Sequence, residues 1–201
     1  MSFLSYLFNG ISLGSVYAII ALGYTMVYGI AKMLNFAHGD VIMIGGYVVL
    51  VSTTTFGCPP LVGILIAVVF CTVLGVVIER VAYRPLRDAS SSLAVLITAI
   101  GVSYLLQNIA LLVFGADTKS FQSVVTMPSL TLADGALTIS GETIVTIISC
   151  IIIMVVLTMF IRNTKAGQAM LAVAEDKGAA QLMGINVNRT IGLTFAIGSG
   201  L

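Results

Sequence analysis

The run MSFLSYLFNGISLGSVYAIIALGYTMVYGIA, residues 1–31, contains no charged side chain. It lacks the basic start of a signal peptide and is longer than the apolar stretch of about 7–15 residues in such peptides, whereas a membrane-spanning helix needs about 20 mostly apolar residues. The whole chain is 59% hydrophobic and 8% charged, compared with about 25% charged residues in globular domains. So few charges could not cover a water-soluble surface, and we predict an integral membrane protein.

Six apolar runs predict the transmembrane helices. They are Leu4–Ile30, Val41–Thr55, Leu61–Ile78, Leu93–Phe114, Thr143–Ile161 and a last run that starts at Ile191. In the first run, Gly10, Gly14 and Ala18 recur at every fourth position, which is typical of close helix packing. Because the last run is short, we expect a chain that is truncated at its C-terminus. The fold prediction is an all-α, polytopic transmembrane helical bundle of about five full spans plus the start of a sixth, forming a single domain over residues 1–201.

The lysines and arginines predict the orientation of this bundle. If successive loops alternate between the two sides, one side receives Lys32, Arg80, Arg84, Arg87, Arg162, Lys165, Lys177 and Arg189. The other side receives only Lys119. Basic residues concentrate in cytoplasmic loops, so we expect a multi-pass protein of the plasma (inner) membrane with its N-terminus outside. In the outer loop, Asp134-Gly135 lies between alternating apolar and polar residues, which predicts a short extracytoplasmic hairpin.

The polar stretch NFAHGD, residues 35–40, separates the first two runs. The run after it, Val41–Thr55, would rise only about 22 Å as a helix, short of a hydrocarbon core of about 30 Å. The helix therefore either begins near Asn35, drawing His38 and Asp40 towards the membrane, or is broken at Gly45-Gly46. These three polar residues are candidates for lining a solute path. The alternative is a tight cytoplasmic turn in which Asp40 caps the following helix.

A second polar stretch, AVAEDKGAAQLMGINVNRT at residues 172–190, lies between two apolar blocks. No residue from Leu171 to Met183 breaks a helix outright, and we predict one short helix there. One face of it is built mostly of small residues: Leu171, Ala174, Gly178, Ala179 and Leu182. Gly184 suits the left-handed residue that ends a helix, and Asn186 or Asn188 can cap the next one. Such a helix either docks a partner through its small-residue face or lies on the membrane surface.

The chain contains no recognisable motif for chemistry of its own. It has no G-x-x-x-x-G-K-[ST] loop for ATP and no H-E-x-x-H metal motif. Cys58, Cys71 and Cys150 show neither metal-ligand spacing nor a disulfide framework. The net charge of +1 gives no attraction for nucleic acid. We expect no catalytic residue, no metal, no cofactor and no nucleic-acid partner.

Three longer stretches carry a family resemblance: NGISLGSVYAIIALGYTMVYGI, MLNFAHGDVIMIGGYV and AEDKGAAQLMGINVNRTIGLTF. Together with ERVAYRPLR at residues 79–87, they resemble the H-type permease subunit of high-affinity importers for the branched-chain amino acids leucine, isoleucine and valine, which are ABC transporters. The resemblance runs the whole length of the chain. It implies the permease domain of an importer, with a cytoplasmic coupling loop at residues 162–190.

The resemblance also implies the role of the second polar stretch. In such permeases the matching segment holds a coupling helix that docks an ATPase subunit. By that carry-over the coupling residues are Glu175, Asp176, Ala179, Ala180 and Gly184, to which the small-residue face adds Ala174 and Gly178. The implied assembly contains a second homologous permease, two ATPase subunits and an extracytoplasmic binding protein, surrounded by membrane lipid. ATP hydrolysis would occur in the partner, so the chain itself would not be an enzyme.

Other functions stay open at this point. Permeases for urea, amides or other amino acids contain similar stretches at residues 35–40 and 172–190. A standalone ion-coupled carrier or channel would usually keep ionisable groups deep in its spans, and the predicted spans contain none in their middles. A membrane enzyme would need a catalytic constellation that the sequence lacks.

Overall fold

The computed structural model describes residues 2–87, 92–120, 130–132 and 137–201. The α-helices are α1 (Ser2–Ala31), α2 (His38–Thr54), α3 (Pro60–Ile78), α4 (Ser92–Phe114), α5 (Gly141–Asn163), α6 (Lys165–Glu175), α7 (Lys177–Leu182) and α8 (Val187–Gly200). Two shorter helical turns follow α3, the π-helical η1 (Glu79–Tyr83) and the 3-10 turn η2 (Arg84–Leu86). The strands β1 (Leu130–Leu132) and β2 (Leu137–Ile139) complete the described elements.

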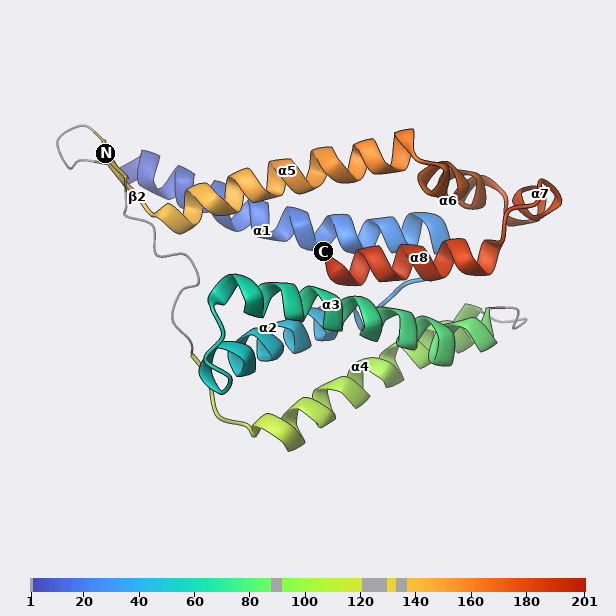
Figure 1. Cartoon of the computed structure of the whole chain (residues 1–201), viewed down its shortest axis with the longest axis horizontal. Coiled ribbons are helices and arrows are strands. Elements are labelled where there is room, and N and C mark those ends of the chain that lie inside the picture. Colours follow the sequence, from blue (N-terminus) through green and yellow to red (C-terminus); the bar gives the residue numbers. More distant parts are fainter. Residues whose placement is uncertain (1, 88–91, 121–129, 133–136) are drawn as a thin grey trace.

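The long helices form an elongated bundle (Figure 1). Contacts between neighbours run in the order α5, α1, α8, α3, α2 and α4. The helix that is last in the sequence, α8, therefore packs between α1 and α3 in the middle of the bundle. The short helices α6 and α7 lie at one end, and the N-terminus and β2 lie at the other (Figure 1).

Four described helical segments are long and apolar enough to cross a bilayer: Tyr6–Ala31, Pro60–Leu86, Leu93–Phe114 and Gly141–Asn163. The helices α2 and α8 are shorter, with 17 and 14 residues. The predicted helical membrane bundle is confirmed. The count of five full spans stays a prediction, because it depends on whether the 17-residue α2 crosses the membrane.

The basic residues separate along the length of the bundle. Eight of the nine lysines and arginines directly follow α1 or η2, or belong to η1, η2, the last turn of α5, α6, α7 and the first turn of α8. Figure 1 shows that these elements and helix ends lie at one end of the bundle. Lys119 follows α4, which ends towards the side of the N-terminus (Figure 1). This arrangement agrees with the predicted topology, while the side that faces the cytoplasm stays a prediction.

The core of the bundle lies where α1, α3 and α8 meet. Ile191, Thr194 and Phe195 of α8 have no exposed surface. The buried Thr194 hydroxyl donates to the Thr190 carbonyl one turn earlier, at 2.9 Å, so its polar group is satisfied inside its own helix. Because this hydroxyl is already bonded, α8 can pack among other helices without burying an unpaired polar group.

Glycines set the distance between α1 and α8. A Cβ atom on Gly23 would lie 2.8 Å from the Gly198 carbonyl oxygen, and one on Gly198 would lie 3.1 Å from the Gly23 carbonyl oxygen. Side chains at either position would push the two backbones apart. Gly10 and Gly14, which the sequence spacing predicted for close packing, instead face open space in the described part of the chain. The close contact thus forms further along the same helix than predicted.

The strands β1 and β2 pair antiparallel, with Leu130 opposite Ile139 and Leu132 opposite Leu137. The predicted turn residues Asp134 and Gly135 lie outside the described residues. The complete hairpin and its place outside the cell stay predictions.

Candidate functional site

The polar stretch at residues 35–40 leads directly into α2, which begins at His38 rather than at Val41. The helix continues without a break through Gly45-Gly46, so the alternative of a broken helix is wrong. Its N-cap is Ala37, which offers no capping side chain. The prediction that Asp40 caps this helix is also wrong, because Asp40 lies inside the first turn and its carboxylate has other partners.

Those partners come from α4. Asp40 is buried, with 8% of its surface exposed. Its Oδ2 accepts a hydrogen bond from Ser103 Oγ at 2.5 Å, and its Oδ1 accepts one from Gln107 Nε2 at 2.9 Å. A buried carboxylate needs such donors, because desolvation without them costs several kcal/mol. Asp40 therefore joins α2 to α4, a role that the sequence reasoning missed although Ser103 and Gln107 are one helical turn apart.

Asn35 and His38 are also buried, with 4% and 5% of their surfaces exposed. Asn35 Oδ1 accepts a hydrogen bond from the Tyr83 hydroxyl at 2.8 Å. The His38 ring lies against α1, where its Cε1 would be 3.1 Å from a Cβ on Gly23. His38 Nδ1 has no hydrogen-bond partner among the described residues. The three candidate path residues thus lie together at the start of α2, and His38 has unused hydrogen-bonding capacity.

A charged pair beside this stretch was not predicted. Arg87 Nη2 donates to Glu79 Oε1, and Arg87 Nη1 donates to Asn188 Oδ1 at 2.6 Å. The side chains of Arg87 and Glu79 are only 8% and 2% exposed. Asn188 belongs to α8, so the pair joins the end of α3 to the start of α8.

The sequence contained a signal for this cluster. Glu79, Tyr83 and Arg87 recur at every fourth residue of ERVAYRPLR, a spacing that places side chains on one helical face. Tyr83 contacts Asn35, and the other two form the ion pair. The face therefore connects residues 35–40 with the start of α8.

A sharp turn between α5 and α6 sets the direction of the coupling segment, residues 162–190. Thr164 is the only residue between the two helices, and its Oγ1 accepts a hydrogen bond from the Gly167 amide at 3.0 Å. A Cβ atom on Gly167 would lie 2.3 Å from the Ile161 carbonyl oxygen. Only glycine permits this approach, because the obstructing atoms are backbone.

The coupling segment then divides into two helices, so the prediction of one helix from Leu171 to Met183 is wrong. Asp176 separates α6 from α7 with φ −149° and ψ 114°. Its Oδ1 accepts hydrogen bonds from the amides of Gly178, at 2.7 Å, and Ala179, at 3.0 Å. An aspartate that satisfies two otherwise unpaired amides makes a good N-cap, and this local bonding competes with a continuous helix.

Both ends of α7 are fixed. Gly184 adopts the left-handed conformation with φ +83°, and Asn186 Oδ1 accepts from the Arg189 amide at 3.0 Å as the N-cap of α8. Both sequence predictions are confirmed. Lys177 Nζ also donates to the Ala31 carbonyl at 2.9 Å, which places a cation at the C-terminus of α1, where the helix dipole favours it. The start of α7 is thereby attached to the end of α1.

The predicted coupling residues do not share one exposed surface. Ala180 is buried and Ala174 is half-buried against the core. The others are exposed: Glu175, Asp176, Gly178, Ala179 and Gly184. The small-residue face therefore points partly inward.

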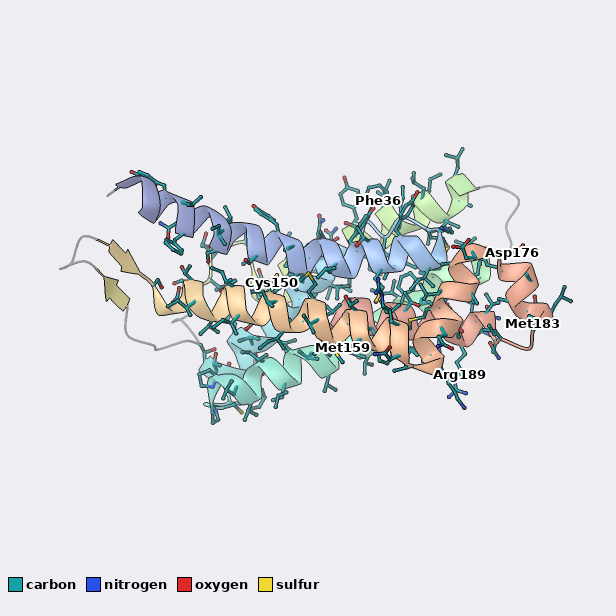
Figure 2. The ribbon with its side chains drawn as sticks, turned by 90° about the horizontal axis from the view of Figure 1, so that it is seen from above. Phe36, Cys150, Met159, Asp176, Met183 and Arg189 are labelled. Atoms are coloured by element: carbon teal, nitrogen blue, oxygen red, sulfur yellow. The ribbon has the colours of Figure 1, made fainter. Side chains whose placement is uncertain are left out.

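The outward surface of α7 is more apolar than predicted. Leu182 and Met183 are 91% and 83% exposed, and with Ala179 they follow i, i+3, i+4 spacing. We name Ala179, Leu182 and Met183 the α7 tip. Figure 2 shows Met183 at one end of the molecule, directed away from it. The sequence reasoning placed Leu182 on the docking face and missed Met183.

Known proteins similar to this chain are permeases for branched-chain amino acids. Residues 6–201 match a family described as the permease component of branched-chain amino acid transport systems. The high-affinity branched-chain amino acid transport system permease protein LivH of Escherichia coli (strain K12) is 42% identical, over 99% of this chain and 68% of its own length. The corresponding protein BraD of Pseudomonas aeruginosa is 39% identical over the same shares. A probable branched-chain amino acid transport permease protein LivH of Methanocaldococcus jannaschii is 28% identical over 86% of this chain and 55% of its own. No solved structure matches.

Proposed function

The chain belongs to the family of permease components of branched-chain amino acid transport systems, and we propose that it is the membrane-spanning permease subunit of an ATP-driven importer of these amino acids. In this proposal the chain forms part of the translocation path and docks an ATPase subunit through α7. A second homologous permease, a second ATPase subunit and an extracytoplasmic binding protein complete the importer. The N-terminus lies outside, and the end with α6 and α7 lies in the cytoplasm.

The observation that carries the docking proposal is the α7 tip. Burying one fully exposed leucine side chain contributes about 1.5–3 kcal/mol, and Leu182 and Met183 are both almost fully exposed. They sit on a short helix whose two ends are fixed by Asp176 and Gly184. A preorganised apolar tip needs little ordering when it binds. Burying this tip in an apolar groove of a soluble ATPase would be more favourable than leaving it exposed to water.

The contacts of α7 also supply a route for coupling. Lys177 attaches α7 to the end of α1, and only residues 32–34 separate that end from residues 35–40. Arg87 and Asn188 attach the start of α8 to the end of α3. A displacement of the docked α7 would therefore reach α1 and α8 as a rigid-body movement, and it would act on the helices next to the candidate path residues.

For the path itself, we propose that Asn35, His38 and Asp40 border the route of the amino acid. His38 Nδ1 is buried without a partner among the described residues, so this ring can bond to a solute or water without first losing a bond at that atom. His38→Leu should lower uptake per assembled importer, with ATPase docking unchanged. Uptake that falls only in proportion to the amount of permease would leave the residue a packing role alone.

Co-purification of the ATPase tests the docking proposal. Disrupting a buried hot-spot contact typically costs about 2 kcal/mol or more, and about 1.4 kcal/mol is a tenfold change in affinity. Ala179→Trp should therefore weaken docking at least tenfold, while insertion and pairing with the second permease continue. Ala116→Trp is the matched control, because Ala116 is exposed and follows α4 rather than α7. Full recovery of the ATPase with Ala179→Trp at equal expression would refute docking at the α7 tip.

A further inference from the structure

A groove opens between η1 with the end of α3 on one side and the first half of α8 on the other. It encloses a cavity of about 440 Å³. Its two ends differ in chemistry. Arg80, Arg84 and Arg189 line one end, and apolar side chains line the other: Val76, Leu193 and Ala196.

The guanidinium groups at the basic end are available to bind an anion. The three arginines are exposed, and none of their guanidinium groups forms a hydrogen bond or ion pair within the part of the chain that the structure describes. Figure 2 shows Arg189 directed away from the ribbon. Glu79 also lines the groove, but its carboxylate is already paired with Arg87. The groove therefore attracts anions, and the planar fork of arginine suits phosphate oxygens.

The apolar end restricts what that anion belongs to. Val76 lies within Pro60–Leu86, the segment of highest mean hydropathy among the spanning candidates. Val76 lies one turn before Arg80, on the side of the apolar α3, so if this segment crosses the bilayer the apolar wall lies nearer to the hydrocarbon core than the arginines do. A peptide chain extending into lipid there would leave its backbone groups unsatisfied, whereas an acyl chain would not. The basic end and the apolar wall together are complementary to an amphipathic molecule with an anionic head.

We propose that this groove binds an anionic phospholipid. Its phosphate lies among Arg80, Arg84 and Arg189, and one acyl chain follows Val76 and Leu193. Basic pockets between transmembrane helices are suited to such headgroups. Glu79 and Asn188 line the same groove and both bond to Arg87, so the lipid braces the joint between α3 and α8. The proposal goes beyond import and does not depend on which solute is carried.

Native mass spectrometry of the purified chain in neutral detergent tests the proposal. The chain is titrated with phosphatidylglycerol or with phosphatidylcholine of the same acyl chains. The wild type should retain phosphatidylglycerol in preference. Arg80→Gln combined with Arg189→Gln should weaken that binding roughly 30-fold, since each basic residue near an anionic lipid contributes about 1 kcal/mol and about 1.4 kcal/mol is a tenfold change in affinity.

The control variant removes the same charge elsewhere. Arg162→Gln combined with Lys165→Gln changes two exposed basic residues that do not line the groove, and its binding of phosphatidylglycerol should stay within twofold of the wild type. An equal loss in both double variants would overturn the proposal, because general surface charge would then explain the binding. Equal retention of phosphatidylcholine by the wild type would overturn it as well.

Two further outcomes identify another ligand. Glycerol phosphate has the head without the acyl chains. If it displaces phosphatidylglycerol at concentrations similar to those of the lipid itself, the groove holds a soluble phosphate compound and the lipid assignment fails. If the Arg80 and Arg189 substitutions leave lipid binding unchanged and abolish ATPase co-purification, the arginines contact a protein instead.

Discussion

Removing one partner of the buried ion pair should destabilise the bundle strongly. Glu79→Gln leaves the Arg87 guanidinium, 8% exposed, without its counter-charge. Its Nη1 keeps Asn188 as acceptor, while its Nε already lacks a partner among the described residues. Breaking a buried pair in this way costs about 3–5 kcal/mol, compared with about 0–1 kcal/mol for an exposed pair. Because Asn188 stays bonded, we expect the lower figure, about 3 kcal/mol.

Reactivity of the Cys71 thiol measures this effect. Cys71 lies in α3 and is 6% exposed, so a thiol reagent reaches it after the bundle opens. The experiment uses a background in which Cys58 and Cys150 are serine. There, a loss of about 3 kcal/mol in stability should raise the fraction of open molecules roughly 100-fold. Glu142→Gln is the control, since Glu142 is exposed and such a change is usually within about 0.5 kcal/mol.

A double-mutant cycle decides whether the loss comes from the pair itself. Arg87→Met removes the unpaired cation and keeps an apolar stem of similar length. Combined with Glu79→Gln, it should recover part of the lost stability, because no buried charge is left without a partner. If the two losses simply add, Glu79 and Arg87 do not interact and the reasoning fails.

Three further predictions concern topology, the start of α2 and the turn before α6. In intact cells, a membrane-impermeant thiol reagent should label Lys119→Cys but not Lys165→Cys, each made in a cysteine-free background. Labelling of Lys165→Cys would refute the predicted topology. Asp40→Asn should keep most uptake, since an amide can still bond to both α4 partners, whereas Asp40→Leu should not; equal uptake by both would exclude a role for these bonds. Gly167→Ala should lower the thermal stability of the bundle, because the added Cβ would collide with backbone at 2.3 Å, while Gly101→Ala, which faces open space, should not; equal melting temperatures would argue against the tight turn.

Several features could be predicted because they depend on only a few neighbouring residues. Apolar runs predicted the membrane bundle, because a helix in lipid satisfies its own backbone hydrogen bonds and needs only apolar side chains. Gly184 and Asn186 were predicted correctly as helix end and helix start, because a left-handed residue and an N-cap act within one turn. Asp176 carried the same kind of local signal, and overlooking it led to the wrong prediction of one continuous helix.

The tertiary structure decided which polar groups meet. Asp40 looked like a cap because the sequence near it offers no other partner, yet its donors come from α4, more than sixty residues away. Arg87 and Asn188 are separated by 101 positions, and they meet because the last helix packs between α1 and α3. Local chemistry therefore determined that these helices form and where most of them end. Burial in the assembled bundle determined the partners of their charged side chains, since a charge removed from water must be satisfied by whichever groups the packing brings next to it.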